Sequence, residues 1–249
     1  MKLKHGILAC AALWGACIPS AGAYELRPMV IELSPAGSGS SASVTITNTH
    51  KVPIAIEVSV HKREQNTDGS DKLSPEVEDL IVTPPQMIIP PGASQSVRVQ
   101  WVGNGVPDHE LPYRLVTQQL PIRLSQVTRN DRTADLTMKY RYEASLYIVP
   151  KGVEPSVRIG SAEVVSSESG DKLRLTILSE GTKRAILESP RLTLASAAGN
   201  VVLEGEGLAE LQGMNILPGS TRIVDIAAPQ GFSKGTVSAE IETRYMFAR

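Results

Sequence analysis

The chain has little cysteine, few aromatic residues and no excess of charge of either sign. Its two cysteines, Cys10 and Cys17, both fall within the first 23 of 249 residues. A mature chain that begins after them has no disulfide, so a hydrophobic core must hold it folded. The 25 Lys and Arg residues balance 26 Asp and Glu residues. This balance gives no indication of a nucleic-acid partner or of an anionic membrane surface.

Recognisable catalytic and metal-binding patterns are also missing. His50, His61 and His109 are isolated from one another and from cysteine, so we interpret them as surface residues and predict no metal site. The sequence has no G-x-S-x-G motif, no Ser/His/Asp grouping and no nucleotide-binding loop. It therefore predicts no enzyme, no cofactor and no nucleotide.

Two acidic stretches are interpreted without function. Asn66–Asp71 resembles half of a calcium-binding loop but lacks the bidentate glutamate, so its Asp68-Gly69 pair predicts a hairpin loop instead. Glu76, Glu78 and Asp79 are expected to form a solvated surface cluster.

The first 23 residues have the pattern of a secretory signal peptide. Lys2 and Lys4 precede the apolar run Ile7–Ile18, and an A-x-A exit ends at Ala23. The run is 12 residues long, too short to span a bilayer. Cleavage after Ala23 would export the chain to the periplasm. A lipoprotein signal at Cys17 is the alternative, disfavoured by Trp14.

The rest of the chain alternates polar and apolar residues with the period of β-strands, most extensively over Leu136–Val149. We expect an all-β fold of two immunoglobulin-like sandwiches, residues 24–150 and a smaller 151–249, joined by the corner Pro150–Pro155. The strands expected in the first are Met29–Leu33, Ala42–Thr47, Ile54–Val60 with a possible extension to Glu64, Leu80–Thr83, Met87–Ile89, Ser94–Val102, Tyr113–Leu120 and Leu136–Val149. Those expected in the second are Val157–Val165, Lys172–Leu178, Ala185–Leu194, Val201–Gly205, Gly207–Leu211, Thr221–Ala227 and Thr236–Phe247.

A series of short motifs runs through the first predicted domain. They are Ser43–Asn48, Asp68-Gly69, Ile81–Pro85, Ile89–Gly92 followed by Val97–Val99, Tyr113–Leu115, Leu120–Leu124 and Tyr140–Tyr142. Their order and spacing, from Met29 to Pro150, resemble the periplasmic chaperones of the chaperone–usher pilus pathway, especially the archaic branch. The resemblance implies an L-shaped pair of sandwiches whose long strand completes an open pilin subunit by donor-strand complementation.

The donor residues that the resemblance implies lie at the start of the long strand. We expect Leu136, Met138, Tyr140 and Tyr142 to enter pockets of the pilin, since Met adapts its shape and Tyr keeps a polar tip. The alternative is that these side chains face the protein's own core. Core packing is the expected role of the later residues of the same parity, Ala144, Leu146 and Ile148.

The resemblance also implies basic residues that anchor the C-terminal carboxylate of the pilin, which would fix the register of the added strand. Arg114, in its Tyr-Arg pair, is the first candidate. Arg141 and Arg27 come second and Lys139 third, and the alternative for each is a solvated surface cation. The sequence departs from the better-known branch at Ser145, where a lysine is usual.

The resemblance therefore implies a chaperone that caps pilin subunits and delivers them to an outer-membrane usher without nucleotide. The rival interpretations are a structural or adhesive β-sandwich subunit of a surface organelle, and an enzyme with a site between two domains. An exposed edge on the long strand would also favour self-association of the free protein.

Overall fold

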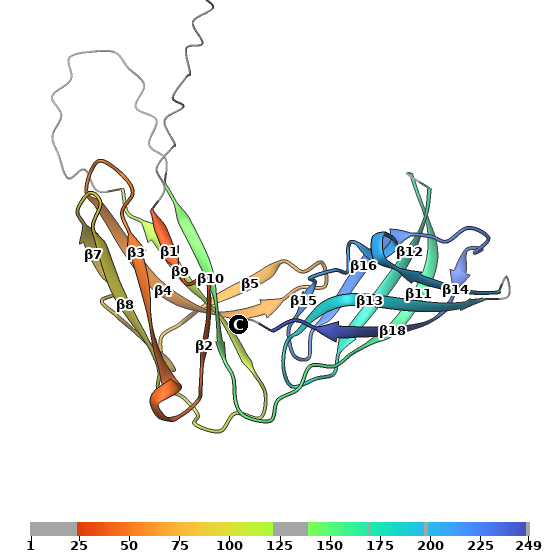
Figure 1. Cartoon of the computed structure of the whole chain (residues 1–249), viewed down its shortest axis with the longest axis horizontal. Coiled ribbons are helices and arrows are strands. Elements are labelled where there is room, and N and C mark those ends of the chain that lie inside the picture. Colours follow the sequence, from red (N-terminus) through yellow and green to blue (C-terminus); the bar gives the residue numbers. More distant parts are fainter. Residues whose placement is uncertain (1–23, 122–138, 169, 197–198, 248–249) are drawn as a thin grey trace, which may run out of the picture.

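A computed structural model describes residues 24–121, 139–168, 170–196 and 199–247. They form two β-sandwiches that meet at an angle and give the molecule the shape of an L (Figure 1). The predicted all-β architecture is confirmed. In the described residues, no helix has the length and apolar character needed to cross a membrane.

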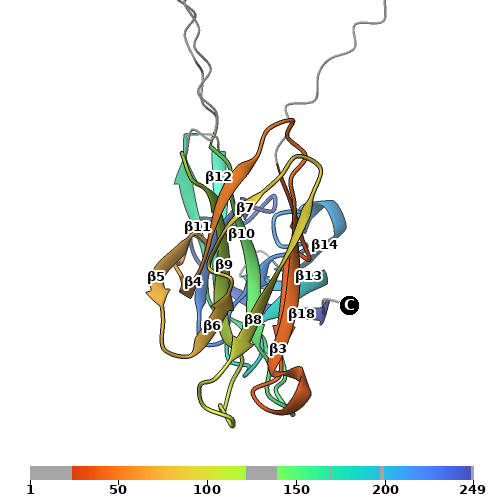
Figure 2. The same ribbon diagram turned by 90° about the vertical axis from the view of Figure 1, so that its left-hand side faces the viewer.

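The first sandwich has a four-stranded and a six-stranded sheet. The four-stranded sheet has the order β1-β3-β8-β6, and the six-stranded sheet has the order β2-β10-β9-β4-β5 with β7 also on β4. Figure 2 looks onto the four-stranded sheet, and the six-stranded sheet lies behind it, toward the second sandwich. The strands are β1 (Glu25–Arg27), β2 (Val30–Leu33), β3 (Ser41–Thr47), β4 (Ile54–Gln65), β5 (Asp71–Glu76), β6 (Leu80–Thr83), β7 (Gln86–Ile89), β8 (Ser94–Trp101), β9 (Leu111–Gln119) and β10 (Arg141–Ile148).

The core between these sheets follows from the period-2 alternation of the strands. Val44, Val97 and Leu115, from β3, β8 and β9, are fully buried in one cluster. Each lies on the inner parity of its strand, as alternation requires. The six-stranded sheet consequently presents its opposite parity to the second sandwich.

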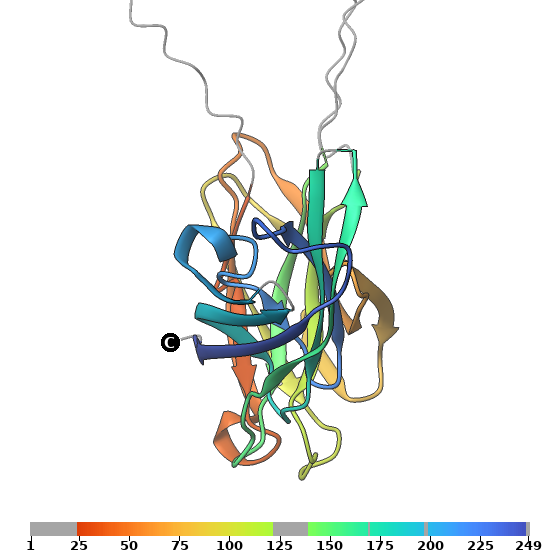
Figure 3. The same cartoon turned by 90° about the vertical axis from the view of Figure 1, so that its right-hand side faces the viewer.

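The second sandwich contains the remaining described strands and the 3-10 helix η2 (Gly205–Leu208). One of its sheets has the order β16-β12-β11-β17, and the other has β14-β13-β15 with β18 on β13 (Figure 3). Its strands are β11 (Val157–Ser167), β12 (Gly170–Ser179), β13 (Ala185–Ser196), β14 (Gly199–Glu204), β15 (Asn215–Ile216), β16 (Thr221–Ala227), β17 (Gly235–Thr236) and β18 (Ser238–Tyr245).

Several sequence-based expectations differ from the structure. Gly207–Leu211 was expected as a strand but belongs to η2 and the turns after it. Asp71–Glu76 was not expected as a strand, yet it forms β5, because the Asp68-Gly69 loop returns the chain along β4. Gly69 has φ of +89°, as the predicted loop requires. Among the described residues of the long predicted strand, the strand β10 begins at Arg141.

The expectation that Glu76 is a solvated surface residue is wrong. Its residue is 5% exposed, and its carboxylate accepts hydrogen bonds from the amides of Glu78 and Asp79. Lys62 Nζ lies 2.9 Å from the second carboxylate oxygen. These partners hold the pKa of Glu76 below its usual value against the effect of burial. Glu76 therefore ends β5 as a structural cap, which composition alone did not reveal.

Candidate anchoring site and donor strand

Arg114 lies on the face of the six-stranded sheet that points away from the core of the first sandwich. In the sheet register it lies between Ser145 of β10 and His61 of β4. Its neighbours Tyr113 and Leu115 point the other way and are buried in the core. The alternation of β9 therefore turns the arginine toward the angle of the L.

Hydrogen bonds fix the guanidinium of Arg114 on this face. Its Nε and Nη2 lie 2.9 and 2.7 Å from Oδ2 of Asp71, and its Nη1 donates to Ser145 Oγ at 2.6 Å. Its side chain is 18% exposed. A guanidinium has five N–H donors, and only Nε and Nη1 each donate a hydrogen bond to a described residue, so at least one N–H on each terminal nitrogen has no hydrogen-bond partner among the described residues.

Asp71 joins Arg114 to a chain of polar groups that reaches the second sandwich. Its Oδ1 accepts from Arg63 Nε at 2.8 Å, and Arg63 Nη1 donates to the hydroxyl of Tyr147 at 3.1 Å. Asn215 Nδ2, on β15, donates to the same hydroxyl at 3.1 Å. The Asp71 carboxylate thus pairs with both Arg63 and Arg114. The cluster of these three side chains has a net charge of +1 and is little exposed to solvent. Such a charge favours an incoming carboxylate.

The other predicted anchor residues lie elsewhere and are more exposed. Arg141 shares the face of Arg114 but lies opposite Gln118, four residues along β9 or about 13 Å away, and it pairs with Glu143 at 2.8 Å. Arg27 is on the other sheet with 80% of its side chain exposed. Lys139 is exposed just before β10. The structure therefore encloses Arg114 and does not gather the four cations together.

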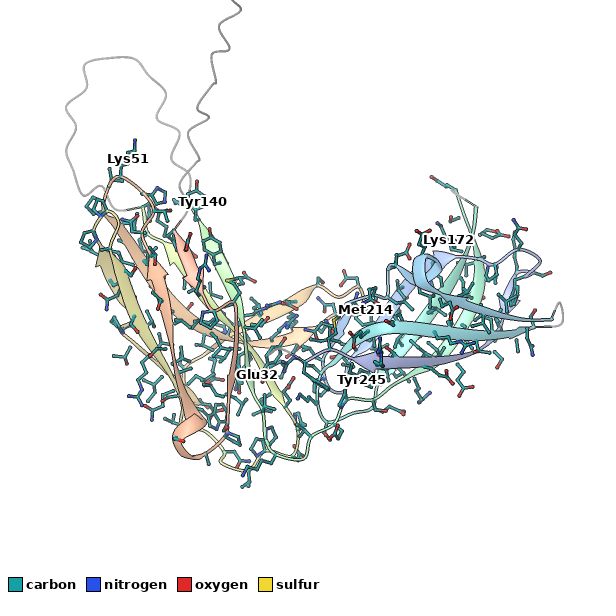
Figure 4. The ribbon with its side chains drawn as sticks, in the orientation of Figure 1. Glu32, Lys51, Tyr140, Lys172, Met214 and Tyr245 are labelled. Atoms are coloured by element: carbon teal, nitrogen blue, oxygen red, sulfur yellow. The ribbon has the colours of Figure 1, made fainter. Side chains whose placement is uncertain are left out.

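The predicted donor residues are only partly visible. Leu136 and Met138 lie outside the described residues. Tyr142 is half-buried, with its ring edge-to-face on Tyr24 at a centroid distance of 4.8 Å, and the Tyr140 ring lies 5.6 Å from that of His50. Figure 4 shows Tyr140 at the end of the first sandwich that is remote from the angle of the L.

The later residues of the same strand behave as expected. Ala144, Leu146 and Ile148 are fully buried in the core of the first sandwich, which confirms their predicted role. The strand thus enters its own core at Ala144, and its earlier tyrosines only border that core.

One edge of β10 is unpaired along its first half. The Tyr140 carbonyl accepts from Gln119 on β9, whereas the Ser145 amide donates to Met29 on the other side. By alternation, the amides of Arg141 and Glu143 also point away from β9. The parallel ladder with β2 begins only at Ser145. Over Arg141–Ala144, therefore, no strand of the described residues covers this edge.

A second ionic cluster lies at the angle of the L, where the two sandwiches meet. Arg184 is 1% exposed, with its guanidinium 3.8 Å above the ring of Tyr147. Its Nη1 donates to Glu110 at 2.5 Å and its Nη2 to Glu32, which Figure 4 labels at this angle. Burial raises the pKa of Glu110, and Arg184 opposes that effect. The cluster links the segment just before β13 to β2 and to the segment just before β9 in the first sandwich.

Residues 31–154 match the model of the family described as pili and flagellar-assembly chaperone, PapD N-terminal domain. The matched segment contains Arg114, Asp71 and the free edge of β10. The chain belongs to the pilus-assembly chaperones.

Solved structures of similar fold cover nearly the whole chaperone. A chain from the CsuC–CsuE chaperone–tip adhesion subunit complex of Acinetobacter baumannii gives a TM-score of 0.56 at 19% identity, covering 87% of this chain and 97% of that one. A chain from a chaperone–tip adhesin complex of CFA/I fimbriae gives a TM-score of 0.54 at 18% identity, covering 87% of this chain and 98% of that one. The E. coli chaperone DraB gives a TM-score of 0.52 at 17% identity, covering 90% of this chain and 97% of that one. A comparison with curated proteins found no match.

Sequence reasoning missed the carboxylate partner of Arg114. Asp71 follows the predicted Asp68-Gly69 loop by two residues, and the turn sets it opposite Gln65. Had the strand after this loop been recognised, its register would have placed Asp71 beside the arginines of the chaperone. The Arg184 cluster had no comparable signal, because its three members lie far apart in the sequence, Glu32 in β2, Glu110 just before β9 and Arg184 just before β13. In the described ranges, no group of His, Cys, Asp or Glu side chains could hold a metal ion.

Proposed function

We propose that this chaperone caps pilin subunits in the periplasm by donor-strand complementation and delivers them to an outer-membrane usher. Its β10 edge completes the sheet of the subunit, and Arg114 binds the terminal carboxylate of the subunit. Leu136, Met138, Tyr140 and Tyr142 supply the alternate apolar side chains of the lent strand. Delivery needs no nucleotide if the final contact between subunits packs better than the contact with the chaperone.

The observation that carries this proposal is that the unpaired edge of β10 ends directly beside Arg114. The edge is open over Arg141–Ala144, and the next residue, Ser145, lies directly opposite Arg114. A strand added to this edge with its C-terminus at Arg114 must run parallel to β10. The strand β2 occupies the same edge in parallel from Val30 onward, so the added strand must end at Ser145.

The periplasmic location rests on the leader and on the burial of Tyr24. Cleavage after Ala23 makes Tyr24 the first residue of the mature chain. Its side chain is 1% exposed, and its hydroxyl lies 2.8 Å from both the carbonyl and Oγ1 of Thr117. Tyr24, at the proposed cleavage point, is thus packed into the first sandwich.

The test is co-expression of the full-length chain with its pilin, followed by affinity capture from the periplasmic fraction. The captured chaperone should have the intact mass of a chain that starts at Tyr24. Arg114→Ala should lower the yield of one-to-one complex at least about 10-fold, because it removes a charge-assisted contact to the carboxylate. Arg141→Ala is the matched control and should keep most of the complex.

A Tyr140→Asp substitution tests the lent strand separately, since it places a charge where an apolar pocket is expected. Circular dichroism must first show that each variant is folded. Equal capture of the pilin by the wild type, Arg114→Ala and Tyr140→Asp would refute the proposed cleft. A wild type that captures no pilin, while the pilin folds alone, would refute the chaperone function and favour an adhesive subunit.

A further inference from the structure

We propose that Asp71 is the positioning residue of the anchoring site and that the hydroxyl of Ser145 is a second donor to the bound carboxylate. This inference rests on the proposed function and adds two residues to the site. It begins from the way in which Asp71 binds Arg114. The carboxylate oxygen Oδ2 contacts both Nε and Nη2, so it holds one side of the guanidinium plane.

Holding that side leaves the opposite end of the guanidinium for a ligand. After the hydrogen bonds to Asp71 and Ser145, at least one N–H on each terminal nitrogen of Arg114 has no hydrogen-bond partner among the described residues. Arginine binds carboxylates best through two parallel N–H donors in one plane. Asp71 fixes that plane in the free protein, so the side chain loses less conformational entropy when the pilin arrives.

Asp71 is held by Arg63 of its own sandwich, and the loop before it is bound to the second sandwich. Arg63 binds its other oxygen, and Arg63 is almost completely buried. The loop just before Asp71 is bound to β16: the Ile223 amide and the Arg222 side chain donate to the carbonyl of Thr67 at 2.8 and 3.3 Å. Because Asp71 is held by Arg63 and follows a loop that is itself bound to β16, its carboxylate can orient Arg114 more rigidly than an exposed carboxylate could.

Ser145 presents a hydroxyl whose own proton is free to be donated. Its Oγ accepts the bond from Arg114 Nη1 at 2.6 Å, and a hydroxyl that accepts one bond can still donate its own. Ser145 is also the residue at which the free edge of β10 ends. The hydroxyl therefore lies where the last residue of an added strand must arrive.

Arg63 and Arg114 give the cluster its net positive charge without a lysine at position 145. Arg63 and Arg114 together carry two positive charges against the single charge of Asp71. A lysine at position 145 would add a third beside Arg114, with repulsion between them. Here a single arginine, oriented by an aspartate, performs the anchoring.

The experiment compares native pilin with a pilin extended by two C-terminal glycines, which moves the carboxylate by about 7 Å. Each is co-expressed with the full-length chaperone, and the dissociation rate of the purified complex is measured against excess competing chaperone. In the wild type, the native pilin should dissociate about 10-fold more slowly than the extended one. Asp71→Asn should reduce this ratio to nearly one, and Asp71→Glu should restore part of it.

Further variants separate positioning from stability and from charge. Ser145→Ala should lower the ratio about threefold, and Ser145→Thr, which keeps the hydroxyl, should retain it. Asp225→Asn is the control, because Asp225 also pairs with an arginine, Arg174, through two hydrogen bonds of 2.8 Å, but on the second sandwich, away from Arg114. It should leave the ratio unchanged.

The outcomes are distinguishable. If Asp71 only offsets charge, Asp71→Asn makes the native complex longer-lived, and the inference is wrong. A ratio in Asp71→Asn equal to that of the wild type also overturns it, while leaving the proposed function intact. A wild type that does not distinguish the two pilins overturns the anchoring role of the site and this inference with it.

Discussion

Tyr24, the first residue after the proposed cleavage point, contacts both β9 and β10. Its hydroxyl is bonded to Thr117 on β9, and its ring packs against Tyr142 on β10. Burial raises the pKa of Tyr24 to about 12. Tyr24 therefore supports Tyr142, the tyrosine that we propose borders the pilin.

We predict that this burial makes the folded chaperone sensitive to alkali. The folded-state pKa of Tyr24 is raised, so its contribution to stability is complete below the unfolded pKa of 10.0 and is lost as the pH rises toward about 12. Urea unfolding of the wild type and of Tyr24→Phe, at several pH values, checks this. The wild type should be more stable at pH 8 by about 1 kcal/mol, and the difference should shrink above pH 10. A difference that stays constant would contradict the prediction.

At the scale of elements, the β4–β5 hairpin carries Asp71, the carboxylate of the proposed anchoring site, and contacts the second sandwich. Its loop depends on Gly69, whose φ is +89°. A Cβ at this position would collide with the guanidinium of Arg222. The absence of a side chain thus lets Arg222 reach the loop carbonyls of Thr67 and Asp68.

We predict that Gly69→Ala destabilises the chaperone more than an alanine at an open turn does. Gly92→Ala is the matched control, since Gly92 also has positive φ, +70°, but no atom lies within 4 Å of the added carbon. Both variants incur backbone strain of about 1 kcal/mol. Only Gly69→Ala also displaces Arg222, so its free energy of unfolding in urea should fall further. Equal losses would show that the contact with Arg222 contributes nothing.

At the scale of the whole molecule, Arg184 links the two sandwiches. Its partners Glu110 and Glu32 belong to the first sandwich, and Glu110 is fully buried. A buried ion pair adds little net stability, but removal of one partner leaves an uncompensated charge. The cluster therefore fixes how the sandwiches meet, and with it the angle beside the anchoring site.

We predict that Arg184→Met lowers the free energy of unfolding by about 3 kcal/mol at pH 7. The loss should shrink in acid, because burial raises the pKa of Glu110 and its protonated form is stable below that pKa. Arg158→Ala, which breaks an exposed pair with Glu180, should cost less than about 1 kcal/mol. Small-angle scattering should show a changed angle only for Arg184→Met. Equal stability losses in the two variants would contradict this role.

The sequence by itself determined the strands and the class of fold, because period-2 alternation and turn chemistry are local properties. It predicted Thr221–Ala227 to the residue and the loop at Gly69. Through its Tyr-Arg pair, the sequence also indicated Arg114 as the first candidate for the anchor. It could not predict β5, whose residues DKLSPE hardly alternate and which pairs only because the hairpin returns it to β4.

Only the tertiary structure decided which polar groups meet. Asp71 reaches Arg114 across 43 residues, and Arg184 reaches Glu32 across 152. Such contacts depend on sheet register and on how the two sandwiches meet, and neither is written in local spacing. Burial likewise turned Glu76 from an expected surface residue into a cap. The alternation of polar and apolar residues therefore defines the strands, whereas the packing of the strands brings Asp71 to Arg114 and Glu32 to Arg184.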